Sequence, residues 1–279
     1  MRIDLHAHST CSDGTESPEQ VLVAAAEAGL DVVALTDHDT TLGWAAAQTV
    51  ARALGIALVR GVELSCRADH ASVHLLAYLP DPDHPGMLTE ADRIRSSRME
   101  RAQAIVDRLA TDMELTWEDV LAQVEPGATV GRPHIADALA ARGHVPDRTA
   151  AFAALLATGS RYYVPHYATD VVRAVELVRA AGGVPVLAHP GAVVRGGTVS
   201  DATIRRTVDA GLAGLEVHHR DNPPEQRERL TALAVTYGLL VTGASDYHGR
   251  GKPNRLGENT TDPEVYAAIV EQGALDVVG

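Results

Sequence analysis

The sequence has few cysteines, few aromatic residues and no long apolar run. Its two cysteines, Cys11 and Cys66, are too few for a disulfide framework or a thiolate metal site. No window reaches the apolar length of a membrane span, and Arg2 and Asp4 stand where a signal peptide would begin its apolar core. We therefore expect a cytoplasmic protein with free thiols and no membrane contact.

The sequence also lacks an excess of positive charge. Its formal net charge is −13, whereas a surface that holds long nucleic acid has to neutralise many phosphates. We therefore expect no long nucleic acid as a partner, although a small anionic substrate or short RNA fits if the site supplies its own positive charge. Aromatic residues make up only 4% of the chain, so the core is expected to pack mainly through Ala, Leu and Val.

Strands and helices are predicted to alternate along most of the chain. About seven apolar segments of strand length are separated by helical patterns, the first of which starts with a Ser17 cap and Pro18. Such alternation indicates a mainly parallel sheet with covered faces, and the strand number favours an α/β barrel over an open sheet. Residues 88–159 show helical patterns only. We predict a barrel domain of residues 1–87 and 160–279 with a small helical domain, residues 88–159, inserted into it.

Metal-ligand residue types gather at the predicted strand ends. His6 and His8 lie two apart on a strand and point to one side, with Asp13 in the loop that follows. An isolated His-x-His pair is more often a solvated edge strand. Here the pattern recurs, which a random scatter of the 13 histidines would not produce. The recurring residues are His6, His8, Asp37, His38, Glu63, His189, His218, His219, Asp246 and His248, with His74 inside a strand.

Six segments of the chain carry a resemblance to a known family. They are His6-Ala7-His8, Thr36-Asp37-His38-Asp39, Gly61-Val62-Glu63, Val73-His74, Ala188-His189-Pro190 and Ser245-Asp246-Tyr247-His248. In this order they resemble the polymerase and histidinol phosphatase (PHP) family of metal-dependent phosphoesterases. The insertion with Gly131-Arg132-Pro133-His134 resembles the branch of nucleoside 3',5'-bisphosphate phosphatases and 5'-3' exoribonucleases. The resemblance implies a distorted seven-stranded (β/α)7 barrel whose active site is covered by the helical insertion.

The resemblance also implies a set of ligands for two or three divalent metal ions. The first ion would be held by His6, His8, Glu63 and Asp246. The second would share Glu63 and add His74 and His189, and the third would be held by Asp13, His38 and His248. Mixed imidazole and carboxylate ligands suit Mn, Zn or Fe(II) without choosing among them. Magnesium alone fits less well, because it prefers oxygen ligands and retained waters.

A carboxylate such as Glu63 can hold two cations roughly 3.5–4 Å apart, so that a water between them ionises near neutral pH. We therefore predict attack on phosphorus by a metal-bridging hydroxide, with Glu63, Asp246 and His189 as catalytic residues. Two other residues are candidates for binding the substrate phosphate: Arg132 through its planar fork, and His134 as a further donor. The alternative is that Arg132 pairs with an acidic neighbour and His134 only caps a helix.

Two further predictions concern residues outside the metal motifs. Strand alternation lets only one of His218 and His219 face the pocket, and we assign a substrate or outer-shell role to His219. Arg95, Arg98 and Arg101 recur at three-residue spacing, which is typical of a solvated charged face of a helix.

Together these features predict a metal-dependent phosphohydrolase that acts on a phosphate ester of a small nucleotide. The 3'-phosphate of a nucleoside 3',5'-bisphosphate is the first choice. Trimming of short RNA from its 5' end is the second, followed by hydrolysis of histidinol phosphate or of a cyclic phosphate. A metal-stabilised binding module is the non-enzyme alternative. The sequence leaves the proton donor to the leaving group and the oligomeric state open.

Overall fold

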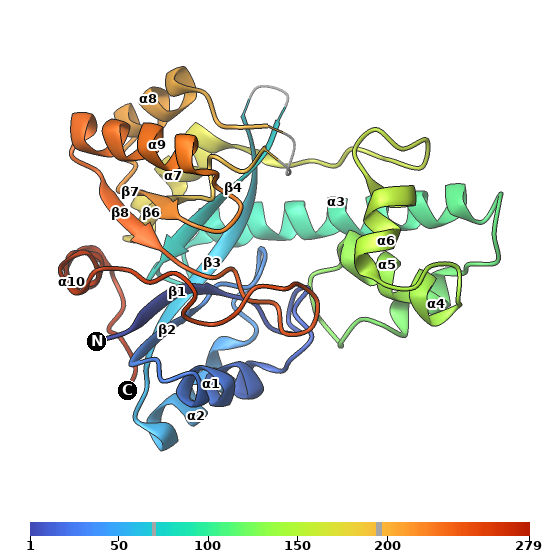
Figure 1. The fold of residues 1–279 in the computed structure, drawn as a ribbon, viewed down its shortest axis with the longest axis horizontal. Helices are drawn as coiled ribbons and strands as arrows, with labels where there is room; N and C mark the ends of the chain where they lie inside the picture. Colours follow the sequence, from blue (N-terminus) through green and yellow to red (C-terminus); the bar gives the residue numbers. More distant parts are fainter. Residues whose placement is uncertain (69–70, 194–196) are drawn as a thin grey trace.

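A computed structural model describes residues 1–68, 71–193 and 197–279, and Figure 1 shows the path of the chain. The strands are β1 (Ile3–Ala7), β2 (Val32–Leu35), β3 (Ala57–Ala68), β4 (Ala71–Tyr78), β5 (Thr169–Asp170), β6 (Val184–Ala188), β7 (Gly214–His218) and β8 (Leu240–Gly243). The helices are α1 (Pro18–Glu27), α2 (Trp44–Leu54), α3 (Pro85–Leu109), α4 (Trp117–Leu121), α5 (Arg132–Ala141), α6 (Arg148–Ala151), the π-helix η1 (Phe152–Leu156), α7 (Val171–Ala180), α8 (Asp201–Asp209), α9 (Pro224–Tyr237) and α10 (Pro263–Gln272).

Seven strands form one nearly closed sheet in the order β1-β2-β3-β4-β6-β7-β8, and the short β5 pairs with β3 outside this path. The two edges approach each other, because Tyr247 after β8 forms a parallel bridge with Ala7 at the end of β1. The predicted α/β barrel-like fold with seven strands is therefore confirmed. The interior holds apolar side chains such as Ile3, Leu5 and Val186, all inaccessible to solvent.

The sheet is mixed because β4 runs antiparallel to both β3 and β6. Only residues 69–70 separate β3 from β4, and a connection of this length cannot carry a parallel crossover. The antiparallel direction of β4 decides where His74 lies. His74 lies in the middle of β4, yet it pairs with Ser65 of β3 and with Ala188 at the end of β6. A mid-strand residue thereby reaches the same edge as residues that follow parallel strands.

The helices surround the sheet on both flanks. Helices α1 and α2 pack on the first strands through an apolar cluster that includes Val21, Leu22 and Ala47. Helices α7 and α9 cover the other flank, where Val175, Val178 and Leu230 are fully buried. The predicted start of α1 is correct, since Ser17 and Gln20 form a reciprocal capping box. In the part of the chain that the structure describes, no helix combines the length and apolar character needed to cross a membrane.

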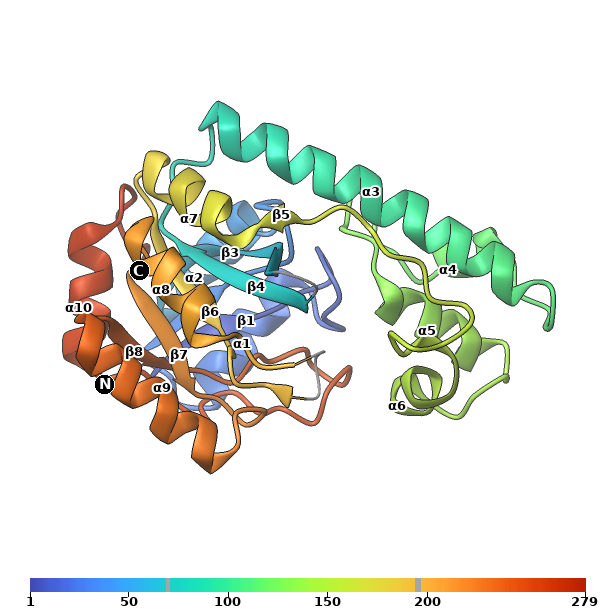
Figure 2. The same cartoon turned by 90° about the horizontal axis from the view of Figure 1, so that it is seen from above.

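The segment from α3 to η1 extends away from the sheet (Figure 2). Helix α3 begins at Pro85, three residues before the predicted insertion, because the His84 imidazole accepts a hydrogen bond from the Met87 N–H and caps it. Side chains of α3, α4, α5 and η1 share an apolar cluster of their own, which includes Ile105, Leu109 and Leu139. The division into two domains stays a prediction, but this cluster gives the insertion a core.

Candidate metal centre

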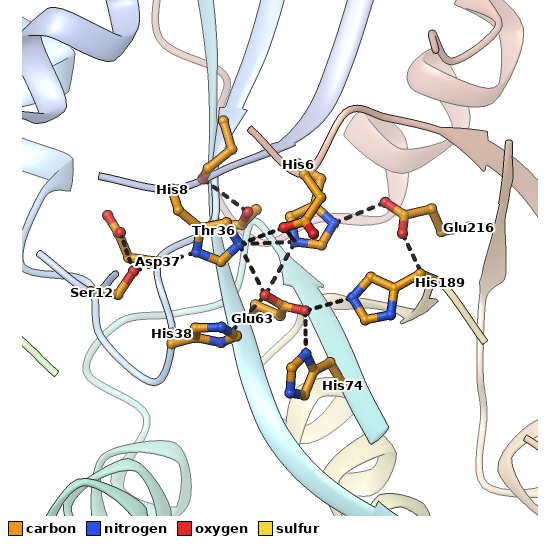
Figure 3. A network of polar contacts seen from close by, with 12 residues as sticks. His6, His8, Ser12, Thr36, Asp37, His38, Glu63, His74, His189 and Glu216 are labelled. Carbon is orange, nitrogen blue, oxygen red and sulfur yellow. Dashed lines mark hydrogen bonds and ion pairs between the residues drawn. The ribbon is translucent and has the colours of Figure 1, made fainter. Parts of the chain in front are cut away.

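The nine predicted metal ligands converge at one end of the sheet. Figure 3 labels His6, His8, His38, Glu63, His74 and His189 among them. His6 lies on β1, His38 follows β2, Glu63 lies within β3, His189 follows β6 and Asp246 follows β8. Eight of these nine residues are buried below one-tenth exposure, the exception being the half-buried His74, and all nine contact at least one other member of the group. The strand order thus gathers residues that are more than two hundred positions apart in sequence.

His6, His8, Glu63 and Asp246 form the most compact group. The Nε2 atoms of His6 and His8 are 3.0 Å apart and lie 3.2 and 3.0 Å from Glu63 Oε2. The same two atoms lie 3.4 and 3.3 Å from Asp246 Oδ1. Ligand atoms held by one cation at about 2.0–2.2 Å must be about 3.0–3.5 Å from one another. These separations therefore have the size that a shared divalent cation requires.

Two more groups adjoin the first. Asp13 lies near His8, His38 and His248, with its Oδ1 3.1 Å from His248 Nε2 and its Oδ2 3.8 Å from His38 Nε2. Glu63 forms the third group with His38 and His74, the Nδ1 of His74 lying 2.7 Å from Glu63 Oε1.

The geometry differs from the implied ligand sets in three respects. His8 also belongs to the group of Asp13, His38 and His248. His38 is shared by two groups, since its Nδ1 is 3.3 Å from Glu63 Oε2. His189 contacts Glu63 Oε1 through Nε2 at 3.2 Å, but the third compact group contains His38 in its place. Glu63 belongs to the first and the third group, so it is placed to be shared between two ions, as the predicted bridging role requires.

Unpaired polar atoms in the same place support a metal site. In the described part of the chain, Asp13 Oδ1, His38 Nδ1, Glu63 Oε2 and His248 Nε2 are buried and make no hydrogen bond. Buried polar atoms without partners are rare in folded proteins and call for an unseen partner such as an ion. The donor set and its spacing therefore fit divalent cations, while their identity and number are not fixed by these atoms.

The pKa shifts of the clustered residues also fit a metal site. Burial disfavours ionised Glu63, but the histidines His74, His38 and His6 outweigh it and hold the pKa of Glu63 well below its ordinary value. Burial likewise opposes a charged His8, yet its close contacts with the Asp246 and Glu63 carboxylates raise its pKa to about 9. Without a cation, Glu63 and Asp246 are thus compensated by protons on His6 and His8, whose pKa values are both raised. Metal binding has to displace these protons, so its affinity depends on pH.

Glu216 is a site residue that the sequence interpretation missed. Its Oε1 accepts a hydrogen bond from His6 Nδ1 at 2.9 Å, and its Oε2 accepts one from the backbone N–H of His189 at 2.7 Å. A carboxylate on Nδ1 leaves the lone pair on Nε2, which faces the cluster. The available signal was a lone acidic residue inside the apolar β7 segment Leu215–Val217.

The two aspartates of the Thr36–Asp39 motif, Asp37 and Asp39, hold neighbouring segments of the site in place through hydrogen bonds. Asp37 accepts hydrogen bonds from the Ser9 N–H at 2.8 Å and from the Ser12 hydroxyl at 2.6 Å, so it holds the loop that leads to Asp13. Asp39 accepts a hydrogen bond from the Ser65 N–H at 2.7 Å and pairs with Arg98 Nε at 3.0 Å.

Comparison with known proteins decides the family. A model of the PHP domain matches residues 4–113. A 3',5'-nucleoside bisphosphate phosphatase from Chromobacterium violaceum is 32% identical over 93% of this chain and 92% of its own. The chain belongs to the PHP family.

Other PHP relatives have different named activities. A 5'-3' exoribonuclease from Haemophilus influenzae is 31% identical over 88% of this chain and 90% of its own. A phosphoribosyl 1,2-cyclic phosphate 1,2-diphosphodiesterase from Eggerthella lenta is 33% identical over 88% of this chain and 94% of its own. The crystal structure titled as that of a metal-dependent phosphoesterase from Bifidobacterium adolescentis has a TM-score of 0.96 to this fold. Its sequence is 43% identical to this one, and the match covers 98% of this chain and 96% of that chain.

Family membership and the buried cluster together make this PHP protein a metal-dependent phosphoesterase. The sequence prediction of an enzyme of this class is confirmed. The relatives carry names that refer to a nucleotide, an RNA or a cyclic phosphate, so the family alone does not choose the substrate.

The residues predicted to bind substrate lie in two places: His219 contacts the metal centre, whereas Arg132 and His134 lie at the start of α5. Arg132 starts α5, donates to the Leu156 carbonyl at 2.9 Å and lies near the rings of Phe152 and Tyr163. His134 uses Nδ1 to accept a hydrogen bond from the Gly131 N–H at 3.1 Å, which is the capping alternative. His219 is buried beside His189, with a ring distance of 5.2 Å, whereas His218 is exposed.

The prediction of a solvated arginine stripe on α3 is wrong for Arg98 and Arg101. Their exposed fractions are 7% and 6%, and Arg101 Nη1 lies 3.0 Å from His166 Nδ1. Three-residue spacing placed them on one helix face correctly, but that face points toward the barrel. Arg98 is accommodated there because Asp39 and Ser65 bind its guanidinium.

Proposed function

We propose that this protein removes the 3'-phosphate from nucleoside 3',5'-bisphosphates. The observation that carries this proposal is a second cationic locus beside the metal centre. Arg98, Arg101 and Arg132 gather with His166 at the junction of α3 and α5. Among the contacts that the structure gives, Asp39 is the carboxylate that pairs with Arg98. One carboxylate thus faces three guanidinium groups, which leaves an excess of positive charge.

The charges in this locus repel one another. Burial and then the charges of Arg98 and Arg132 lower the pKa of Arg101 to about 9. Burial and the same arginines lower the pKa of His166 to about 2. A phosphate bound there would relieve this repulsion and accept charge-assisted hydrogen bonds from planar forks. The locus therefore has the chemistry of an anion site.

The cationic locus adjoins the metal centre through two contacts. Arg98 Nη2 donates to Ser65 Oγ, and Ser65 pairs with the candidate ligand His74 across β3 and β4. One phosphate at the metal centre and another at the arginines would match a small molecule with two phosphates. A nucleoside 3',5'-bisphosphate has this form, and the relative from Chromobacterium violaceum carries that name.

The roles at the reaction centre follow from the contacts. Glu63, His6, His8 and Asp246, together with Asp13, His38, His74, His189 and His248, would hold two or three divalent ions, for which Mn, Zn and Fe(II) are the candidates. When bound, such ions supply Lewis-acid charge to phosphate oxygens and acidify a coordinated water. Glu216 orients His6, and the arginines hold the second phosphate so that the ester to be cleaved lies over Glu63.

The test compares adenosine 3',5'-bisphosphate with adenosine 3'-phosphate, which differ only in the second phosphate. With Mn added, we expect the bisphosphate to be the better substrate, and Arg132→Met or Arg101→Met to abolish this preference. Loss of a charged hydrogen bond should reduce kcat/KM for the bisphosphate about 10–100-fold. Arg142→Met is the matched control, because Arg142 is an exposed residue directly after α5 that pairs with Glu114 and Asp119. Equal rates on both compounds in the wild type would refute the proposal.

Trimming of short 5'-phosphorylated RNA is the second candidate, because the same arginines could bind a terminal 5'-phosphate and a relative carries the exoribonuclease name. A panel with such an RNA, histidinol phosphate and a cyclic nucleotide separates the candidates. Rates that rise with RNA length would favour the nuclease, whereas preference for the bisphosphate favours the phosphatase.

A further inference from the structure

Lys252 is the only lysine in the sequence. All the other residues among its 24 Lys and Arg are arginine. The two side chains differ in chemistry, since an ammonium is a compact charge on a flexible stem and a guanidinium is a planar fork that grips a carboxylate with two hydrogen bonds. The surroundings of Lys252 therefore show where this chain uses an ammonium in place of a guanidinium.

Lys252 lies at the rim of the metal centre, six residues after Asp246. Its Nζ donates to Asp246 Oδ2 at 2.9 Å, and its side chain remains 29% exposed while that of Asp246 is fully buried. The other oxygen of Asp246, Oδ1, faces the Nε2 atoms of His6 and His8. Asp246 thus lies between the candidate metal ligands and the ammonium.

The two sides of Asp246 compete electrostatically. Without a metal ion, the ammonium compensates the charge of this buried carboxylate. A divalent cation bound by His6, His8, Glu63 and Asp246 would neutralise the same carboxylate and repel the ammonium. The four-carbon stem allows Nζ to turn to another anion at the rim. A guanidinium at this position would hold Asp246 with its fork and oppose metal binding.

We propose that Lys252 is a substrate-binding residue of the reaction centre, whose ammonium leaves Asp246 when the metal binds and donates hydrogen bonds to the phosphate oxygens of the ester. The proposal rests on the proposed function only in placing a phosphate ester at the metal centre. It does not require that ester to be a nucleotide. The exposed part of the side chain gives Nζ access to a ligand that enters from solvent.

A protein with one lysine allows a direct test by amine acetylation. Sulfo-N-hydroxysuccinimide acetate labels only Lys252 and the α-amine, which serves as the internal reference in mass spectrometry. We expect Mn to increase the labelling of Lys252 and inorganic phosphate to protect it again in the Mn-loaded protein. Bound Mn is measured in the same samples, because phosphate that merely removed Mn would also return Lys252 to Asp246 and lower its labelling. Equal labelling with and without phosphate, at unchanged Mn content, would overturn the proposal.

Two substitutions give a second readout with p-nitrophenyl phosphate as substrate. Lys252→Met should bind Mn at least as tightly as the wild type, because a competing cation is gone. Its kcat/KM should nevertheless fall about 100-fold, as when one oriented donor to a reacting phosphate or oxyanion is removed. Lys252→Arg should bind Mn more weakly, because its fork stays on Asp246. Arg255→Met, an exposed change in the same loop, is the matched control.

The opposite pattern would show an ordinary structural ion pair. In that case Lys252→Met would lose Mn affinity and turnover together, and Lys252→Arg would restore both. The aryl phosphate also separates this proposal from the substrate assignment. If the wild type cleaves p-nitrophenyl phosphate but not adenosine 3',5'-bisphosphate, the nucleotide assignment fails while labelling and Mn affinity still decide the role of Lys252.

Discussion

At the scale of single residues, Glu216 fixes the direction in which His6 presents its lone pair. The carboxylate accepts hydrogen bonds from His6 Nδ1 and from the His189 N–H, and it is inaccessible to solvent. Partners of this kind orient metal-binding imidazoles, and their loss reduces metal affinity about 10–100-fold. We therefore expect Glu216→Gln and Glu216→Ala to weaken Mn binding by that factor, measured by competition with a chelating dye.

Glu176→Gln provides the comparison for this prediction, because Glu176 is an exposed residue of α7 that pairs only with Arg173 in the contacts the structure gives. Circular dichroism should show that all three variants fold. Unchanged Mn affinity in both Glu216 variants would mean that the orientation of His6 is set by other contacts.

His166 gives a prediction about pH. Its pKa is lowered to about 2, first by burial and then by Arg101, Arg98 and Arg132, whereas an unfolded histidine titrates near 6.5. Between these values the unfolded chain binds a proton that the folded chain does not. The free energy of unfolding therefore has its full value above pH 6.5 and falls as the pH falls, by about 1.4 kcal/mol between pH 7.5 and 5.5.

The measurement is urea denaturation of the metal-free protein at these two pH values in a buffer without phosphate. His166→Asn lacks the titrating group, so its loss of stability on acidification should be smaller by this amount. All other groups contribute to both proteins and cancel in the difference. Parallel losses in the two proteins would show that His166 is protonated in the folded state.

The candidate ligands could be predicted from sequence because histidines and carboxylates are unusual at the ends of apolar segments. Glu216, Arg98 and Arg101 could not be assigned in this way. A charged residue becomes buried only where tertiary neighbours compensate it, as Asp39 and Ser65 do for Arg98. Such neighbours are distant in sequence and leave no local pattern.

At the scale of elements, the insertion holds the loop that carries Asp13. Arg148 at the start of α6 pairs with Asp137 of α5 through two hydrogen bonds of 2.6 Å, and its Nη1 donates to the Asp13 carbonyl at 2.9 Å. The Thr129 N–H donates to the Cys11 carbonyl at 3.0 Å. The position of Asp13 thus depends on helices that lie outside the barrel.

We expect Arg148→Met to reduce the number of Mn ions that the protein retains through gel filtration, because the Asp13, His38 and His248 group loses its support. Metal analysis after the column measures this number. Arg142→Met, which removes an exposed ion pair at the C-terminal end of α5, should retain the wild-type number. Equal metal content in both variants would show that the insertion does not set the position of Asp13.

Elements differed in how well the sequence predicted them. The bounds of helix α9, Pro224–Tyr237, follow from local signals, because Pro224 begins the helix and Gly238 ends it in the left-handed conformation. The direction of β4 could not be predicted from its apolar pattern, since alternation is the same in parallel and antiparallel strands. The short connection from β3 is the one local sign of the reversal.

At the scale of the whole molecule, the free energy of metal binding should add to the stability of the fold. The cluster joins β1, β3, β6 and the loop after β8, so an ion held there links segments from both ends of the chain. Unfolding separates these ligands and releases the ion. A ligand that binds only the folded chain stabilises it by about 2.7 kcal/mol at one hundred times its dissociation constant.

For a chain of this length we therefore expect Mn at that concentration to raise the thermal midpoint by about 5–10 °C over the protein treated with a chelator. The midpoint should rise further with the logarithm of the Mn concentration, and His6→Ala should reduce the rise because it removes a ligand from the most compact group. Differential scanning calorimetry across a Mn series measures both effects. A midpoint independent of Mn would mean that the folded chain binds Mn no more tightly than the unfolded chain does, and it would contradict a metal site that is assembled by the fold.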